Sequence, residues 1–297
     1  MSIVTNFMAV PNRIAIGCEY LQFVGNAGAS SEDFERALSP LKVRDEQGGT
    51  SIATGVLKEL EDLGLASAGE DGNIRLSEAP GTQRRHFASW HDFLVPYILR
   101  LLVFHDVAAE HRQRNVPEAI AWLLCQDSTR PVRSGEHAEL LAKQFEPGDF
   151  EVNLDNDSRF QNLVYWCTYL GFCESFASPG DRSGRCVADP TRAIRRVLPE
   201  VFDRMGRLPI EAFVTELAER LPVLENGDVR ESVERRLRTE YQRRERHFSQ
   251  STSLALRRLE LAGDIRLFQL SDAPAWLRVS GAEIATVSHI ERVEAAT

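Results

Sequence analysis

The chain has 297 residues, of which 43% are hydrophobic and 27% charged, and its formal net charge is −9. This length suits two or three domains, and the composition is that of a folded globular protein rather than a disordered chain. No apolar run approaches the roughly 20 residues that a membrane-spanning helix needs. The N-terminus also lacks the basic segment and long apolar core of a signal peptide. We therefore expect a cytoplasmic protein.

The cysteines fit that compartment. Their number, five, is odd, and no two of them have Cys-x-x-Cys spacing. The sequence therefore indicates neither a disulfide framework nor a zinc site, and it predicts buried, reduced thiols. The residues concerned are Cys18, Cys125, Cys167, Cys173 and Cys186.

One pattern of apolar spacing and turn residues occurs three times along the chain. In each copy, apolar residues at helical spacing end at a glycine, and a strand, a polar turn and a returning strand follow. The glycines are Gly64, Gly171 and Gly263. The strands are expected at residues 65–67 and 74–76, at 172–176 and 185–188, and at 265–270 and 275–279.

Further helices are expected ahead of each copy. They cover residues 13–28 and 34–38, then 93–107 and 116–125, and finally 195–206 and 208–221. Helices followed by a hairpin that covers the edge of their small core are typical of a winged helix. The same order is common in other α+β proteins, so the interpretation depends on its threefold recurrence.

The sequence thus predicts a mainly α fold with small β-hairpins (α+β), built from three winged-helix-like units in tandem. The predicted domains are an acidic N-terminal winged helix at residues 1–80, a central helical or winged-helix unit at 84–190, a C-terminal winged helix with a basic helix at 193–285, and a tail at 286–297.

Charge is distributed unevenly over these units. Residues 1–80 hold 6 basic and 12 acidic side chains, residues 81–192 hold 12 and 15, and residues 193–297 hold 17 and 17. An acidic surface repels phosphates. If a part of the chain contacts a nucleic acid, we therefore expect it to be the last third.

The third helix of each unit supports this ranking, because a winged helix inserts that helix into the major groove of DNA. In the first unit, Lys58 is outnumbered by neighbouring carboxylates, and the hairpin tip carries Glu70 and Asp71. In the second unit this helix is mostly apolar, so we expect it to be buried or to form a protein interface. Its predicted interface residues are Tyr165, Trp166 and Tyr169. The second hairpin tip is a weak signal, with Arg182 and Arg185 against Asp181.

The third unit is rich in arginine. This density can neutralise several phosphates, and the polar start of the last helix, residues 250–253, also favours an anion. The alternative is an exposed helix with internal salt bridges, such as Glu231 with Arg235 and Glu234 with Arg238. The predicted nucleic-acid-binding residues are Arg235, Arg236, Arg238, Arg243, Arg244, Arg246, Arg257 and Arg258.

The sequence contains no Walker A loop, dinucleotide fingerprint or nucleophile elbow. Two His-Asp pairs, at residues 91–92 and 105–106, with His111 nearby, would lie on nearly opposite faces of one continuous helix and could not share an ion. The carboxylate-rich stretch at residues 149–157 lacks the glycine and final glutamate of a calcium loop, and we expect it to cap a helix starting near Ser158. We predict a non-enzymatic protein with no catalytic residues, metal or cofactor.

Both ends of the chain resemble a known family. The segment PNRIAIGCEYLQFVGNAGASSEDFERALSP at residues 11–40, the acidic first unit and the segment VSHIE at 287–291 resemble the DpdG-like family. The resemblance implies a protein encoded in bacterial clusters that place 7-deazapurines in DNA and restrict unmodified DNA. It supplies no catalytic residues.

Our leading hypothesis is a non-catalytic, DNA-associated or adaptor subunit of a bacterial phage-defence or DNA modification–restriction assembly. The first two units would contact proteins and the third would contact double-stranded DNA, with no membrane contact. A purely structural tandem winged-helix adaptor of a condensin-like complex is an alternative. Another is a winged-helix transcription regulator, which is disfavoured because such proteins usually carry their basic recognition helix in the first unit. A homodimer is left open.

Overall fold

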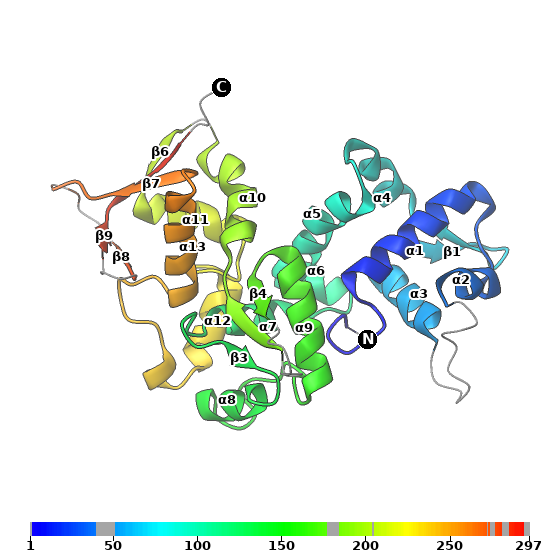
Figure 1. Ribbon diagram of the computed structural model, residues 1–297, viewed down its shortest axis with the longest axis horizontal. Coiled ribbons are helices and arrows are strands. Elements are labelled where there is room, and N and C mark those ends of the chain that lie inside the picture. The colour runs from blue at the N-terminus through cyan, green and yellow to red at the C-terminus, as the bar shows by residue number, and fades with distance from the viewer. Residues whose placement is uncertain are drawn as a thin grey trace. The chain divides into compact units, whose positions relative to one another are not determined.

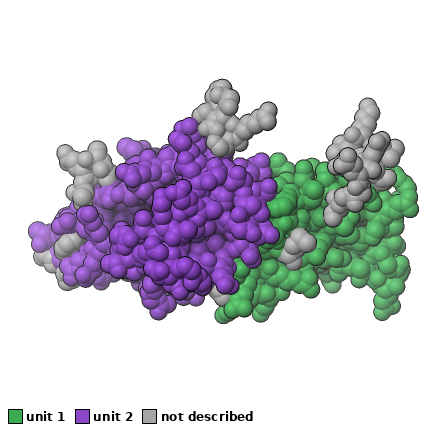
Figure 2. Space-filling view, turned by 90° about the horizontal axis from the view of Figure 1, so that it is seen from below, with its two compact units in different colours: residues 1–116 green, residues 117–297 purple. Residues whose placement is uncertain are grey.

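The computed structural model describes residues 2–39, 51–176, 184–203, 205–271, 273, 277–280 and 285–293 (Figure 1). The protein is mainly helical, with small antiparallel sheets, and the predicted fold class is confirmed at this level. The chain forms two compact units, unit 1 (residues 1–116) and unit 2 (residues 117–297), which Figure 2 colours green and purple. The finer division into three units stays a prediction.

Unit 1 opens with three helices and a hairpin. Ser30 and Ser51 cap the second and third helices by accepting hydrogen bonds from the backbone amides of Asp33 and Thr54. Gly64 follows the third helix with a φ of 69°, a left-handed conformation that favours glycine. The elements are α1 (Pro11–Val24), η1 (Gly25–Ala27), α2 (Ser31–Leu38), α3 (Ile52–Asp62), β1 (Ala66–Ala68) and β2 (Ile74–Leu76).

The rest of unit 1 is helical. Its elements are α4 (Glu78–Gln83), η3 (Arg84–His86), α5 (Trp90–Val103) and α6 (His105–Glu110). The helix that the sequence predicted over residues 93–107 is interrupted, because Phe104 adopts an extended conformation between α5 and α6. The two His-Asp pairs therefore lie in the first turns of separate helices, and not on one continuous helix as we expected.

The first part of unit 2 repeats the order of elements found in unit 1. Gly171, with a φ of 90°, ends the long helix before the hairpin. The elements are α7 (Val116–Leu124), β3 (Val132–Arg133), α8 (His137–Gln144), α9 (Asp157–Leu170), β4 (Cys173–Phe176) and β5 (Arg185–Ala188). The predicted hairpin tip with Asp181 and Arg182 lies outside the described residues.

The second part of unit 2 repeats this order again, with one additional helix and one additional hairpin. Helix α10 packs against α13 (Figure 1). The elements are α10 (Thr191–Phe202), β6 (Arg207–Pro209), α11 (Ile210–Arg220), α12 (Asp228–Arg236), η4 (Thr239–Tyr241), α13 (Gln250–Leu261), β7 (Ile265–Phe268), β8 (Leu277–Val279), β9 (Ala285–Val287) and β10 (His289–Arg292).

The last sheet corrects the predicted hairpin at residues 265–279. Strand β7 pairs with β10, whereas β8 pairs with β9 in a separate hairpin between them. Residues 289–292, which we placed in a terminal tail, form the central strand of the sheet β6-β10-β7. Ile290 is fully buried in that strand, so burial of this side chain accompanies the long-range pairing.

A short extended segment, not recognised in the sequence, pairs with the second hairpin strand at all three positions. Ala29 forms a bridge with Ile74 of β2, β3 pairs with β5, and β6 pairs with β10. In each case the extended segment precedes the helix or helices that lead to the hairpin. The recurrence therefore includes the topology of the small sheet as well as the helix–hairpin pattern.

Unit 1 contains a buried carboxylate at Glu59 of α3. Its Oε2 accepts a hydrogen bond from Asn6 Nδ2 at 3.0 Å, and its Oε1 accepts one from Gln113 Nε2 at 2.6 Å. Gln113 also accepts a hydrogen bond from the backbone amide of Ile3 at 2.8 Å. Burial raises the pKa of Glu59 to about 7 despite these two hydrogen bonds, which act to lower it.

This shift predicts a pH-dependent stability. The folded chain binds the Glu59 proton more tightly than the unfolded chain, so the free energy of unfolding should fall as the pH rises from 4.5 through about 7. The full change should be about 3 kcal/mol. We expect Glu59→Gln to remove this component and Glu61→Gln, at an exposed position on the same helix, to retain it. Urea denaturation at several pH values measures both, and equal pH dependence in the two variants would contradict the assignment.

Candidate functional site

The eight arginines predicted to bind nucleic acid do not share one helix. Arg235 and Arg236 end α12, the next four lie in the segment that leads to α13, and Arg257 and Arg258 lie in the second half of α13. We call residues 235–258 the arginine segment. Its backbone is fixed against β8, because the carbonyl of Arg246 accepts a hydrogen bond from the amide of Arg278 and the amide of Phe248 donates to the carbonyl of Arg278.

Five of the eight arginines bind carboxylates within unit 2. Most of these partners are distant in sequence, and neither salt bridge that we considered from the sequence is formed with the expected carboxylate. The pairs are Arg236 with Glu118, Arg238 with Glu146, Arg243 with Glu234, Arg257 with Glu260, and Arg258 with Asp189. These side chains already have partners of opposite charge, so contact with phosphate would require an exchange of partners.

Arg235, Arg244 and Arg246 are exposed, as is the paired Arg258. Arg235 donates from Nε to the backbone carbonyl of Glu231 at 3.2 Å rather than to its carboxylate. Among the described residues, no carboxylate contacts the guanidinium groups of Arg235 or Arg244. These two side chains are therefore the most available cations of the arginine segment.

The start of α13 is buried instead of being presented to a ligand. Ser251 donates from Oγ to the carbonyl of Leu124 at 2.6 Å, and the amide of Ser280 donates to Ser253 Oγ at 3.0 Å. Ser251, Thr252 and Ser253 are all buried, whereas Gln250 is exposed. The polar helix start that we expected to favour a phosphate is thus used mainly for packing inside unit 2.

A buried carboxylate, Glu225, holds this helix start. It accepts hydrogen bonds from the amide of Ser249 at 2.8 Å and from Thr252 Oγ1 at 2.7 Å. Burial alone would raise the pKa of Glu225, but the charge of Arg230 and the hydrogen bonds from Ser249 and Thr252 lower it overall. Glu225 is therefore ionised and fixes the N-terminal turn of α13.

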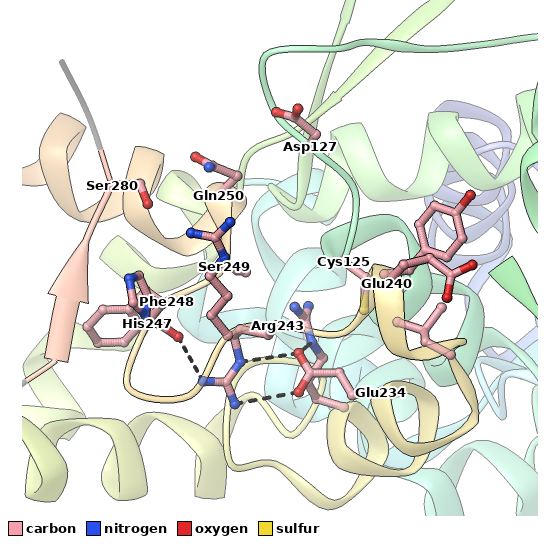
Figure 3. A pocket seen from close by; sticks show the side chains of 14 residues that line it. Cys125, Asp127, Glu234, Glu240, Arg243, His247, Phe248, Ser249, Gln250 and Ser280 are labelled. Atoms are coloured by element: carbon pink, nitrogen blue, oxygen red, sulfur yellow. Dashed lines mark hydrogen bonds and ion pairs between the residues drawn. The ribbon is translucent and has the colours of Figure 1, made fainter. Parts of the chain in front are cut away.

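Arg230 and Glu234 extend this charge cluster along α12. The Arg230 side chain is 1% exposed, and its Nε donates to Glu234 Oε1 at 2.8 Å. Arg243 also binds Glu234, through Nε at 3.3 Å, and donates from Nη1 to the carbonyl of His247 at 2.8 Å. Figure 3 shows the Arg243 guanidinium turned toward Glu234 and this carbonyl. Two arginines thus share one carboxylate.

A pocket of about 520 Å³ lies beside this cluster (Figure 3). It combines the cations Arg243 and Arg244 with the carboxylates Asp127, Glu234 and Glu240. A second pocket, of about 590 Å³, has a similarly mixed lining and shares Cys125, Asp127, Glu240 and Tyr241 with the first. Neither lining has the single sign of charge that would select a phosphate.

Cys125, which lines both pockets, does not have the character of a nucleophilic thiolate. Burial raises the pKa of its thiol to about 12, so the sulfur is protonated at neutral pH. All five cysteines are free thiols, and Cys18, Cys167, Cys173 and Cys186 are buried.

The three aromatic residues predicted for a protein interface have different environments. Trp166 is 1% exposed and lies in the core, Tyr169 is half-buried, and Tyr165 is 50% exposed. The burial of Trp166 corrects its placement on a surface, because one face of α9 packs against β4 while Tyr165 lies on the other. Only Tyr165 presents a largely exposed ring.

The residues considered for metal binding have local structural roles. His111 Nδ1 lies 3.0 Å from the carbonyl of Asp62, and Asp92 binds the capping residue Ser89. The side chain of His105 lies outside the described part. Asn156, rather than one of the nearby carboxylates, caps α9, and Asp155 pairs with Arg159 at 2.6 Å. Within the described residues, no group of three or more histidines, cysteines or carboxylates is arranged to hold a metal ion.

The protein is a mainly helical α+β protein, and most side chains of its arginine segment form ion pairs with carboxylates of unit 2. In the part of the chain that the structure describes, no helix is both long and apolar enough to cross a bilayer. A family model described as DpdG-like matches residues 1–273. The chain belongs to this DpdG-like family, as the sequence predicted, and the family indicates involvement in a DNA modification cluster. No curated protein and no solved structure matches the chain.

The charge cluster predicts a large effect of changing Glu234. Glu234→Gln leaves the buried Arg230 without its closest carboxylate and removes the partner of Arg243, so we expect a loss of about 3 kcal/mol in the free energy of unfolding. Glu231→Gln should have little effect, because Glu231 is exposed and contributes its carbonyl to Arg235. Urea denaturation followed by circular dichroism compares the two, and equal stability would show that the cluster is not stabilising.

Proposed function

We propose that this protein is a non-catalytic adaptor subunit of a bacterial phage-defence or DNA modification–restriction assembly. Its modules, in this proposal, are three winged-helix-like units that contact other proteins of the assembly. The family supports a role in DNA modification, and the threefold order of helix, short strand, helices and hairpin supports the modules. The observation that carries the adaptor role is the internal pairing of the arginine segment.

The state of α13 favours protein assembly over reading of a DNA sequence. A winged helix that reads bases presents the start of its third helix to the major groove. Here that start is bound by Glu225 and Leu124, and Arg257 and Arg258 further along the helix have carboxylate partners. Base recognition through α13 would need these contacts to break first.

The adaptor role predicts a stable complex with other proteins encoded in the same modification cluster. We expect co-expressed, tagged full-length chain to retain at least one of them at constant stoichiometry through size-exclusion chromatography. Nuclease treatment should not dissolve the complex, because its contacts are between proteins. Failure of every such protein to co-elute, or loss of the complex on nuclease treatment, argues against the adaptor role.

Contact with the DNA backbone is a second candidate function, favoured by the exposure of Arg235 and Arg244 and their lack of carboxylate contacts among the described residues. Such contact would be independent of sequence and sensitive to salt. It requires neither insertion of α13 into a groove nor disruption of the ion pairs in the arginine segment. One protein can combine the adaptor role with contact to the DNA backbone.

A salt titration of duplex binding tests this candidate. If both arginines contact phosphates, log K should fall with log salt with a slope of about −2, and the double variant Arg235→Ala, Arg244→Ala should lose this dependence. The matched control is Arg36→Ala, Lys58→Ala, which removes two exposed cations from unit 1. Fluorescence anisotropy with a labelled duplex measures both. Unchanged binding by the double variant would remove this function from consideration.

A further inference from the structure

Helix α1 carries an exposed apolar stripe on the face that does not pack into unit 1. Ile16 is 53% exposed and Phe23 is 87% exposed, and the two side chains are one heptad apart. Asn12 and Glu19 are exposed and project in nearly the same direction, since 3.6 residues form a turn. We call these four residues the α1 stripe.

The opposite face of α1 explains why the stripe stays outside. Ile14, Cys18 and Leu21 are buried at 0 to 1% exposure and form the core side of the helix. Gly17 lies close to α3, where an added Cβ would stand 3.0 Å from Leu60. This close packing fixes the rotation of α1 and leaves Ile16 and Phe23 directed outward.

The packing of α1 within unit 1 uses its opposite face and does not need apolar residues at positions 16 and 23. Single exposed apolar residues are common, but two at heptad spacing on one straight helix match the anchors of helix-to-helix recognition. Covering a large apolar side chain removes its surface from water, which is favourable. The α1 stripe therefore has the pattern expected of a surface that another helix covers.

We propose that the α1 stripe binds an amphipathic helix of another protein, with apolar residues at heptad spacing and a lysine or arginine that pairs with Glu19. This inference rests on the proposed adaptor function and identifies a surface that performs it. The exposed carboxylate of Glu19 lies between the two apolar side chains of the stripe, so the stripe itself favours a basic partner and disfavours nucleic acid.

The position of Glu19 also favours a different chain over a second copy of this one. Glu19 lies near the midpoint between Ile16 and Phe23. If two copies paired antiparallel through this stripe, a twofold axis near its centre would bring the two Glu19 carboxylates together. A parallel pairing would also align them. Like charges in an interface are unfavourable, whereas a cation at that point is favourable.

Site-specific crosslinking in the full chain tests the partner. Phe23 is replaced by the photoreactive p-benzoylphenylalanine, and the chain is co-expressed with the proteins encoded in its modification cluster. After illumination, mass spectrometry identifies the crosslinked peptide. We expect a lysine- or arginine-containing amphipathic helix from another protein. Adding Ile16→Ser and Glu19→Lys should lower the crosslink yield at least about tenfold, since apolar cover and charge pairing are both lost. Glu61→Lys, an exposed charge reversal on α3, should not lower it.

The outcomes separate this inference from the adaptor function. A crosslink to a second copy of the chain, to DNA or to an acidic segment overturns the proposed partner. A complex that co-elutes but gives no crosslink at position 23 overturns the α1 stripe and leaves the adaptor function standing. Absence of any complex overturns both. If Glu61→Lys lowers the crosslink yield as much as Ile16→Ser with Glu19→Lys does, the proposed binding at the α1 stripe is also overturned. The yield would then depend on the net charge of the chain and not on the stripe.

Discussion

Unit 2 depends on two carboxylates, the buried Glu225 and the largely buried Glu234, which compensate its arginines and hold the start of α13. Glu225 fixes the first turn of α13, and Glu234 compensates both the buried Arg230 and the partly exposed Arg243. Ions buried in this way require partners, because removal from water is costly unless charge and hydrogen bonds are matched. The same contacts that stabilise the fold therefore reduce the positive charge that is free to meet a ligand. An anionic ligand would have to compete with these carboxylates for the same side chains.

Local structure could be predicted well from the sequence where single residues determine it. Gly64, Gly171 and Gly263 each follow a helix with positive φ, as their positions after apolar stripes indicated. Contacts between distant residues could not be predicted. The Arg236–Glu118 and Arg258–Asp189 pairs join positions 118 and 69 residues apart. Asp189 looked like part of a linker, although it is buried and also accepts a hydrogen bond from the amide of Thr191.

The short strands show a second limit of sequence reasoning. Ala29 contributes a single bridge and β3 has only two residues, too few for an alternating pattern to appear. Strand β10 pairs with β7 across a whole inserted hairpin, so its partner cannot be found from neighbouring residues. For the candidate site, the sequence shows where arginines are dense but not which of them are paired, and only burial distinguishes Trp166 in the core from Tyr165 on the surface.

The three repeated arrangements keep their sheet topology while their outer surfaces differ. In unit 1 the third helix is acidic and α1 presents an apolar stripe. In unit 2, α9 is largely a core helix and α13 is held at its start by side chains of its own unit. A protein that reads DNA needs to keep its third helices polar and accessible. Acidic charge on α3, burial of one face of α9 and internal contacts at the start of α13 each oppose insertion into a groove, by three different physical means on one sheet topology.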